Sequence, residues 1–424
     1  MVRYFFPEAF VRVLFAGFLI LSCTSPPASA DDPISLNNYA NELLKKQEYE
    51  KALEQLRKAF SLYPYEPTLR RNLAEAYAYV GNRQLEKNSY EEAAATFDRA
   101  RELFPDEVKY VMMRGVALYL AKNYDAAQIE LERARSNGGE TAEVLFFLGR
   151  ARYDTGSLSG AIELWEQALQ LDPTRKVIQE ALEKARRESK VEAGMDRGYS
   201  SRFTVSYDTG TSSDLADSIL STLEDAYNQV GSDLSHFPTS RVPLIIYTKK
   251  DYRTITTSPE WSGGLYDGKI RLPVGGASKL TPLLQGVLFH EYTHVVVQEL
   301  AAGRCPTWLN EGLAEYEERR VFERPLTELK RRIRQGSVLS FDTLERSFAS
   351  LATNDVVLAY EQSYSLVSYM ISTYGWHKVR DILVNLGAGM NQESAVTAAL
   401  EDFGLDFRKV VEEWTAFAAK EFAE

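Results

Sequence analysis

Two histidines and a glutamate in the second half of the chain have the spacing of a metal-binding motif. His290 and His294 are four residues apart, and Glu291 directly follows the first of them. In an α-helix, residues four apart lie on one face, so both imidazole rings can reach the same ion. Glu291 lies one position off that face, within reach of a water molecule that the metal would activate. The spacing predicts a site for one zinc ion per chain, with Glu291 as the general base of a hydrolytic reaction.

A second acidic segment supplies further candidate ligands. The stretch Trp308-Leu309-Asn310-Glu311-Gly312 provides Glu311, and Glu315 lies four residues later on the same helix face. Two histidines and one carboxylate leave a fourth coordination position for water, which is the layout of a catalytic rather than a structural zinc site. A pair of helix histidines also arises by chance, and the added carboxylates favour metal binding over that alternative.

The combined pattern resembles the gluzincin metallopeptidases, whose ligands are HExxH and a glutamate in an Asn-Glu-Gly or Asn-Glu-Ala helix. The stretch WLNEG is similar to that of M1-type aminopeptidases, and residues 195–424 look like a peptidase MA-like domain. The resemblance implies that His290, His294 and Glu311 bind zinc. It also implies that Glu291 takes a proton from the attacking water.

The resemblance assigns two more residues near the metal. Glu315 matches the acidic residue that hydrogen-bonds a ligand histidine from outside the ligand set in thermolysin-like enzymes. Tyr360 matches a tyrosine that stabilises the oxyanion of the tetrahedral intermediate in M1-type enzymes, and we expect it just before a helix over 364–374. Tyr364 is the alternative for this role. Ordinary packing is a third interpretation, because the chain has 24 tyrosines.

Substrate contacts are expected in the segment before the motif. M1-type aminopeptidases hold the free amine of the substrate with a glutamate in a Gly-x-Met-Glu-Asn strand, and this chain has no such motif there. Its own segment contains Gly264 and Tyr266 and could pair with an extended peptide as an edge strand. The missing amine anchor favours an endopeptidase over an aminopeptidase.

Four copies of one helical pattern occupy residues 34–190. The key alanines of the last three copies, Ala93, Ala127 and Ala161, are 34 residues apart, and a longer first spacing predicts two extra helical turns near 67–74. Small residues let two antiparallel helices approach closely. This segment resembles tetratricopeptide repeats, whose arrays present a groove that binds extended peptides or helices of partner proteins. The alternative is that the array only positions the second half of the chain.

The first thirty residues have the features of a signal peptide. Arg3 and Arg12 precede or flank a short apolar run over 13–21, and Ala28-Ser29-Ala30 is a small-x-small cleavage pattern. The run is too short for the roughly twenty residues that a membrane-spanning helix needs, and no later segment qualifies. We therefore expect an exported protein that is periplasmic or secreted. Cys23 leaves open a lipoprotein attached to the membrane.

The composition of the chain disfavours some partners and one structural class. The net charge of −11 disfavours nucleic acid as a partner, and two cysteines cannot form a disulfide scaffold. The fold class expected is mainly α with α+β: a helical solenoid, then a domain with a small β-sheet, the HExxH helix and a helical C-terminal part. The expected substrate is a peptide or an unfolded protein. Two alternatives stay open: a non-catalytic scaffold of the bacterial cell envelope, and a hydrolase of non-peptide amides.

The expected secondary structure of the second domain begins after a polar linker over 194–201. Strands are predicted at 202–207, 242–247 and 269–273, and a helix at 212–230. Thr281 and Pro282 predict the start of the long helix that carries the histidines.

Overall fold

The structure is a computed structural model of the 424-residue chain. It describes residues 32–208, 210–256, 264–274, 277, 279–348 and 351–422. The predicted signal peptide over 1–30, including Cys23, lies outside the described residues. Contacts divide the chain into two compact units, with the division between residues 189 and 190. No helix in the described part of the chain is both long and apolar enough to cross a membrane.

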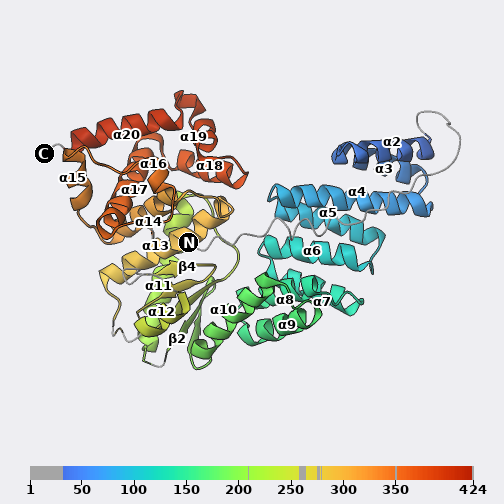
Figure 1. The fold of residues 1–424 in the computed structure, drawn as a ribbon, viewed down its shortest axis with the longest axis horizontal. Helices are drawn as coiled ribbons and strands as arrows, with labels where there is room; N and C mark the ends of the chain where they lie inside the picture. The colour runs from blue at the N-terminus through green and yellow to red at the C-terminus, as the bar shows by residue number, and fades with distance from the viewer. Residues whose placement is uncertain are drawn as a thin grey trace. The chain divides into compact units, whose positions relative to one another are not determined.

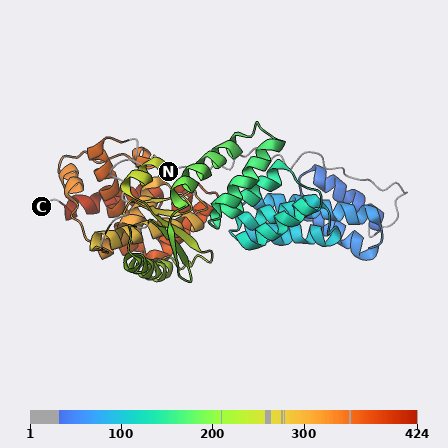
Figure 2. The ribbon, with the colours of Figure 1, turned by 90° about the horizontal axis from the view of Figure 1, so that it is seen from below.

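The first unit consists of antiparallel helix pairs stacked in chain order (Figure 1 and Figure 2). Its helices are α2 (Pro33–Lys45), α3 (Tyr49–Leu62), α4 (Pro67–Glu86), α5 (Tyr90–Leu103), α6 (Val108–Leu120), α7 (Tyr124–Ser136), α8 (Ala142–Asp154), α9 (Leu158–Leu171) and α10 (Lys176–Glu192). Helix α4 has 20 residues, whereas α6 and α8 have 13 each. The longer helix accounts for the longer first spacing in the sequence, as predicted.

Small residues bring the two helices of a pair together. Three pairs place a glycine of the first helix against a large side chain of the second: Gly81 with Phe97, Gly115 with Leu131 and Gly149 with Trp165. A Cβ atom on Gly149 would lie 2.3 Å from Nε1 of Trp165, far inside normal contact distance. The Trp165 ring is fully buried and donates a hydrogen bond from Nε1 to the Phe146 carbonyl at 3.1 Å.

The second unit contains a five-stranded sheet and a set of helices. The elements up to the long helix are β1 (Asp196–Tyr199), β2 (Phe203–Tyr207), α11 (Ser213–Asp233), β3 (Val242–Ile246), α12 (Lys249–Thr256), β4 (Leu265–Tyr266) and β5 (Ile270–Leu272). The remainder is helical: α13 (Pro282–Leu300), α14 (Thr307–Val321), α15 (Thr327–Arg334), α16 (Phe341–Leu344), α17 (Thr353–Tyr374), α18 (Trp376–Gly387), α19 (Gln392–Ala399), the 3-10 turn η2 (Glu401–Phe403) and α20 (Phe407–Glu421).

The strand order is β1-β2-β3-β5-β4, in which the three inner strands are parallel and both edge strands are antiparallel to their neighbours. Alternate residues of the strands, such as Val205 and Leu244, pack against α11 and α13 in the main core. Ile245 on the opposite face of β3 and Tyr247, directly after the strand, form a smaller cluster with α12. The sheet therefore supports α13, the helix that carries His290 and His294.

The structure adds elements that the sequence did not predict. Strand β1 lies in the segment that was predicted to be a linker. It was not predicted because its residues are largely exposed and have no apolar alternation. Helix α12 was also missed. Helix α17 begins at Thr353 rather than 364, so Tyr360 lies within the helix instead of before it. The buried residues Val356 and Ala359 extend its apolar face into the segment before residue 364.

The glycine contacts lead to a stability prediction for the first unit. Gly149→Ala should lower the free energy of unfolding by roughly 1–2 kcal/mol, because the cost of overpacking against Trp165 exceeds the gain of about 1 kcal/mol in helix propensity. Chemical denaturation followed by circular dichroism measures it. The control is Gly160→Ala on α9, where the new Cβ would meet the rotatable Ser157 hydroxyl at 3.0 Å and the flexible Arg152 side chain at 3.7 Å. If both variants are equally stable, the close approach does not limit packing.

Candidate metal centre

Helix α13 begins where the sequence predicted and presents both histidines on one side. The Thr281 hydroxyl accepts a hydrogen bond from the Leu284 amide at 3.2 Å, and Pro282 occupies the first turn. The rings of His290 and His294, one turn apart, have centroids separated by 4.9 Å and are nearly perpendicular. Their side chains are only 13% and 12% exposed.

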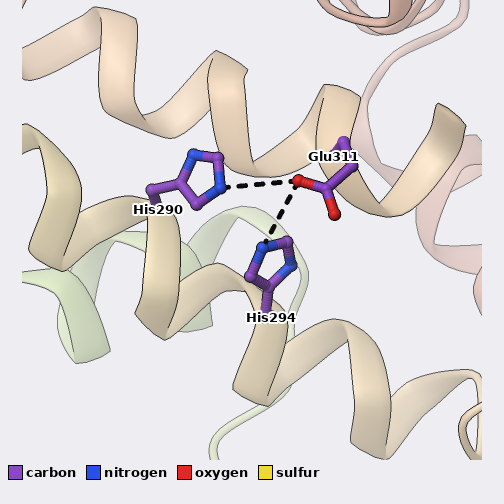
Figure 3. A group of neighbouring side chains, drawn as sticks. All are labelled: His290, His294 and Glu311. Carbon is purple, nitrogen blue, oxygen red and sulfur yellow. Dashed lines mark ion pairs between the residues drawn. The ribbon is translucent and has the colours of Figure 1, made fainter. Parts of the chain in front are cut away.

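Helix α14 brings Glu311 to both imidazole rings (Figure 3). Oε2 of Glu311 lies 3.5 Å from Nε2 of His290 and 3.6 Å from Nε2 of His294. Ligand atoms bound tetrahedrally at about 2.0–2.1 Å from zinc are separated by about 3.3–3.5 Å, so the observed distances need little change to accommodate an ion. Two imidazole nitrogens and one carboxylate oxygen are a donor set that suits zinc. The residues present therefore fit a metal ion.

The other ring nitrogen of each histidine already has a partner. Nδ1 of His290 donates to Oε2 of Glu318 at 2.9 Å, and Nδ1 of His294 donates to Oδ1 of Asn310 at 3.0 Å. Because carboxylate and amide oxygens only accept, the proton of each neutral ring is placed on Nδ1. The lone pair of each Nε2 is then directed to the side where Glu311 lies.

The carboxylate that contacts His290 is not the predicted one. We expected Glu315, but its carboxylate accepts hydrogen bonds from Arg319 at 2.9 Å and from Arg324 at 3.1 Å. Glu318 takes the position beside His290. It lies seven residues, almost two full helical turns, after Glu311 and so projects in nearly the same direction. That spacing was visible in the sequence, as was the position of Asn310 next to Glu311, but neither residue was given this role.

The predicted general base is buried beside the ligands. Glu291 is 4% exposed, and within the described part of the chain its Oε2 has no hydrogen-bond partner. Burial raises the pKa of Glu291 to about 8. The positive charge of a metal ion would favour the ionised carboxylate and so oppose this effect.

Gly264, one of the two predicted substrate-binding residues, lies directly against this carboxylate. A Cβ atom at position 264 would be 2.4 Å from Oε1 of Glu291. The other, Tyr266, lies on the edge strand β4 and is half-buried against the main core. The edge position agrees with the expectation for this segment, and the substrate-binding role of both residues stays a prediction.

Tyr360 lies on α17, which packs closely on α14. A Cβ on Gly312 would lie 2.6 Å from the Ser363 carbonyl, so the glycine after Glu311 permits this approach. The Tyr360 ring packs edge to face with Phe348, with centroids 5.2 Å apart. Burial raises the pKa of the Tyr360 hydroxyl well above its ordinary value, and the nearby charge of Glu311 adds to the shift. The hydroxyl is therefore held in its neutral, hydrogen-bond-donating form.

The alternative tyrosine has a different environment. The guanidinium of Arg319 lies over the Tyr364 ring, 4.6 Å from its centroid, and the Tyr316 ring is 6.2 Å away. These contacts give Tyr364 a packing role. For Tyr360, in contrast, the charges of the carboxylates at the metal ligands, Glu311 first, add to the rise in pKa that burial causes.

Comparisons with known proteins place both halves of the chain. Residues 222–420 match the family model of the Peptidase MA superfamily. Tetratricopeptide-repeat models match residues 34–66, 81–134 and 142–175. The chain therefore contains tetratricopeptide repeats followed by a Peptidase MA superfamily domain, in the predicted order. Peptidases of this superfamily generally depend on a metal ion, and His290, His294 and Glu311 form a group that can hold one.

Solved structures similar to part of the chain include proteins of Desulfovibrio magneticus and Thermus thermophilus. MamA (residue 41 to the end) from Desulfovibrio magneticus RS-1 is 23% identical, with 38% of this chain and 88% of that chain covered and a TM-score of 0.32. TTC0263, a tetratricopeptide-repeat protein of Thermus thermophilus, is 23% identical over 36% of this chain and 81% of its own, with a TM-score of 0.26. No curated protein matches this chain.

The partner of His290 gives a testable difference between two neighbouring glutamates. Glu318→Ala should weaken zinc binding by about 10–100-fold, because loss of a hydrogen-bond partner lets the ligand ring rotate. Glu315→Ala, the matched control on the same helix, should have the smaller effect. Competition with a chromophoric chelator measures both affinities. A larger loss for Glu315→Ala would instead support the partner expected from the sequence.

Proposed function

We propose that this chain is an exported, zinc-dependent peptidase that hydrolyses peptide bonds. The observation that carries the proposal is the convergence of His290, His294 and Glu311 from two helices, with the buried Glu291 carboxylate beside them. The Peptidase MA superfamily match over the same residues supports it. The signal-peptide features of residues 1–30 are the basis for proposing export, in soluble form or with a lipid at Cys23.

The proposed chemistry assigns one task to each side chain. A zinc ion held by His290, His294 and Glu311 would supply a Lewis acid for the scissile carbonyl and lower the pKa of a water molecule. Glu291 accepts the proton of the attacking water and passes it to the leaving nitrogen. The neutral Tyr360 hydroxyl donates a hydrogen bond to the oxyanion that forms at the carbonyl carbon.

The substrate is proposed to be an extended peptide or an unfolded protein. Strand β4 ends the sheet and starts next to Gly264, which lies against Glu291. A peptide that paired with this edge would run past the general base. The absent amine-binding motif favours cleavage within a chain over removal of its first residue. The tetratricopeptide array is proposed to bind a protein partner or the substrate itself.

The proposal is tested first through Glu291. Glu291→Gln should reduce hydrolysis of an unfolded protein by at least about a hundredfold, because a buried amide cannot accept a proton. Its zinc content should stay at one per chain, since Glu291 is not a ligand. The measurements are fluorogenic casein cleavage and metal analysis by mass spectrometry on the mature chain.

A doubly substituted chain, His290→Ala with Glu311→Ala, serves as the comparison and should lose both zinc and activity. Retained hydrolysis by Glu291→Gln would reject the assignment of the base. A wild-type chain that binds no zinc, even after reconstitution, would favour the alternative of a non-catalytic envelope scaffold.

The oxyanion role is tested through a single hydroxyl. Tyr360→Phe should lower kcat by about 10²–10³-fold, because one donor to the oxyanion is lost while the ring still packs on Phe348. Zinc binding should be unchanged. Tyr364→Phe is the matched control on the same helix, and steady-state kinetics on a peptide substrate compare the two. Equal activity of Tyr360→Phe and the wild type would assign Tyr360 to packing alone.

A further inference from the structure

The carboxylate of Glu318 is held from two sides. Its Oε2 accepts from Nδ1 of His290 at 2.9 Å, and its Oε1 lies 2.8 Å from Nη2 of Arg324. Arg324 lies in the short connection between α14 and α15, outside the helix that carries Glu318. The Glu318 side chain is 5% exposed. Its orientation is therefore set by one contact to the metal ligand and one to the arginine.

Arg324 is itself fixed by the neighbouring glutamate. Its Nη2 also donates to Oε1 of Glu315 at 3.1 Å. Glu315 in turn accepts from Nε of Arg319 at 2.9 Å, and Arg319 lies over the Tyr364 ring. The side chains of Glu315, Glu318 and Arg319 are buried, and that of Arg324 is 37% exposed, so solvent screens the contacts of this network only on the Arg324 side.

The same network explains a second acidic group near the site. One ligand atom each of His290, Glu315 and Glu318 lie within 4.8 Å of one another, which is close enough for a cation. The guanidinium of Arg324 contacts both glutamates of this group. The positive charge that balances these two carboxylates is therefore supplied by an arginine side chain.

We propose that Arg324 is a positioning residue for the metal centre. By bridging Glu315 and Glu318 it holds the Glu318 carboxylate against Nδ1 of His290, which keeps Nε2 of that ring directed at the ion. The inference rests on the proposed function, because it requires that the site binds zinc. Glu315, which the sequence predicted as the hydrogen-bond partner of the ligand histidine, instead holds Arg324 in place.

The sign of the effect separates positioning from simple electrostatics. Removing a positive charge near a divalent cation lowers the repulsion between them and should by itself strengthen zinc binding. Losing the clamp on Glu318 leaves the His290 ring less well oriented and should weaken it. A weaker affinity in a variant without the arginine charge is therefore specific to the positioning role.

The experiment compares Arg324→Gln with Arg320→Gln in the full mature chain. The two arginines are matched: their side chains are 37% and 40% exposed, and each pairs with a buried glutamate of α14, Glu318 or Glu317. Arg320 contacts Glu317 and Asp233, neither of which the structure places at the metal ligands. Zinc affinity is measured by competition with a chromophoric chelator at fixed pH. The visible spectrum of the cobalt-loaded chain reports the geometry of the ligands.

Arg324→Gln should bind zinc about tenfold more weakly than the wild type and change the cobalt spectrum, with Arg320→Gln close to the wild type in both. Arg324→Lys, which keeps the charge, should recover part of the affinity. If Arg324→Gln does not fold, as judged by unfolding of the metal-free chain, Arg324→Lys carries the test: weaker binding than the wild type supports the proposal.

Wild-type or tighter zinc affinity in the folded variant would overturn the positioning role and leave the proposed function intact. Absence of zinc binding by the wild type would overturn both. The two failures are thus distinguishable from one set of titrations.

Discussion

The close contact between α13 and α14 is the constraint on which the site depends. Ligands on two separate helices must converge to about the separation that a single ion imposes, and side chains alone cannot make up a large error in helix position. Small residues permit the contact: a Cβ on Gly286 would lie 3.1 Å from Cγ of Glu318. Gly312 has the same effect on the far side of α14, where α17 approaches. The helix that carries the histidines, α13, and the helix that carries Tyr360, α17, therefore both pack on α14, which carries Glu311.

The two halves of the chain have separate cores, which matters for assigning their functions. The buried cluster that contains the sheet, α13, α14 and the C-terminal helices lies within residues 203–418, and the largest cluster of the repeat array lies within residues 74–185. These two clusters share no residue. The repeats are therefore not needed to complete the hydrophobic core around the metal ligands, and a binding role for the array is a separate question from catalysis.

The sequence could predict those parts of the molecule that depend on local periodicity. The helical repeats, the longer α4 and the start of α13 follow from spacing, small residues and capping, all of which act within a few turns. The convergence of His290, His294 and Glu311 could be predicted because the family resemblance relates the glutamate of one helix to the histidines of another. Spacing along the chain does not contain that relation. Strand β1 was missed since an exposed edge strand needs no apolar alternation.

The hydrogen-bond partner of His290 was harder to predict, because the positions four and seven residues after Glu311 both project towards α13. Contacts with Arg319 and Arg324 decide between Glu315 and Glu318, and they depend on tertiary packing that a single sequence does not contain.

The charges around the metal ligands explain why two arginines accompany the carboxylates of this site. Four carboxylates, those of Glu291, Glu311, Glu315 and Glu318, lie in or beside the site, and Arg319 and Arg324 pair only with the outer two. Burial by itself lowers the pKa of His290, but its contacts with Glu311 and Glu318 outweigh that effect and raise the pKa well above its ordinary value. The inner part of the site therefore favours a positive charge at this position. A proton on His290 or a metal ion at its Nε2 would each supply this positive charge. Only a metal ion would also bind Nε2 of His294, which faces the same oxygen of Glu311. The arginines neutralise the outer carboxylates, so the surplus of negative charge is concentrated where Glu311 faces the two imidazole rings.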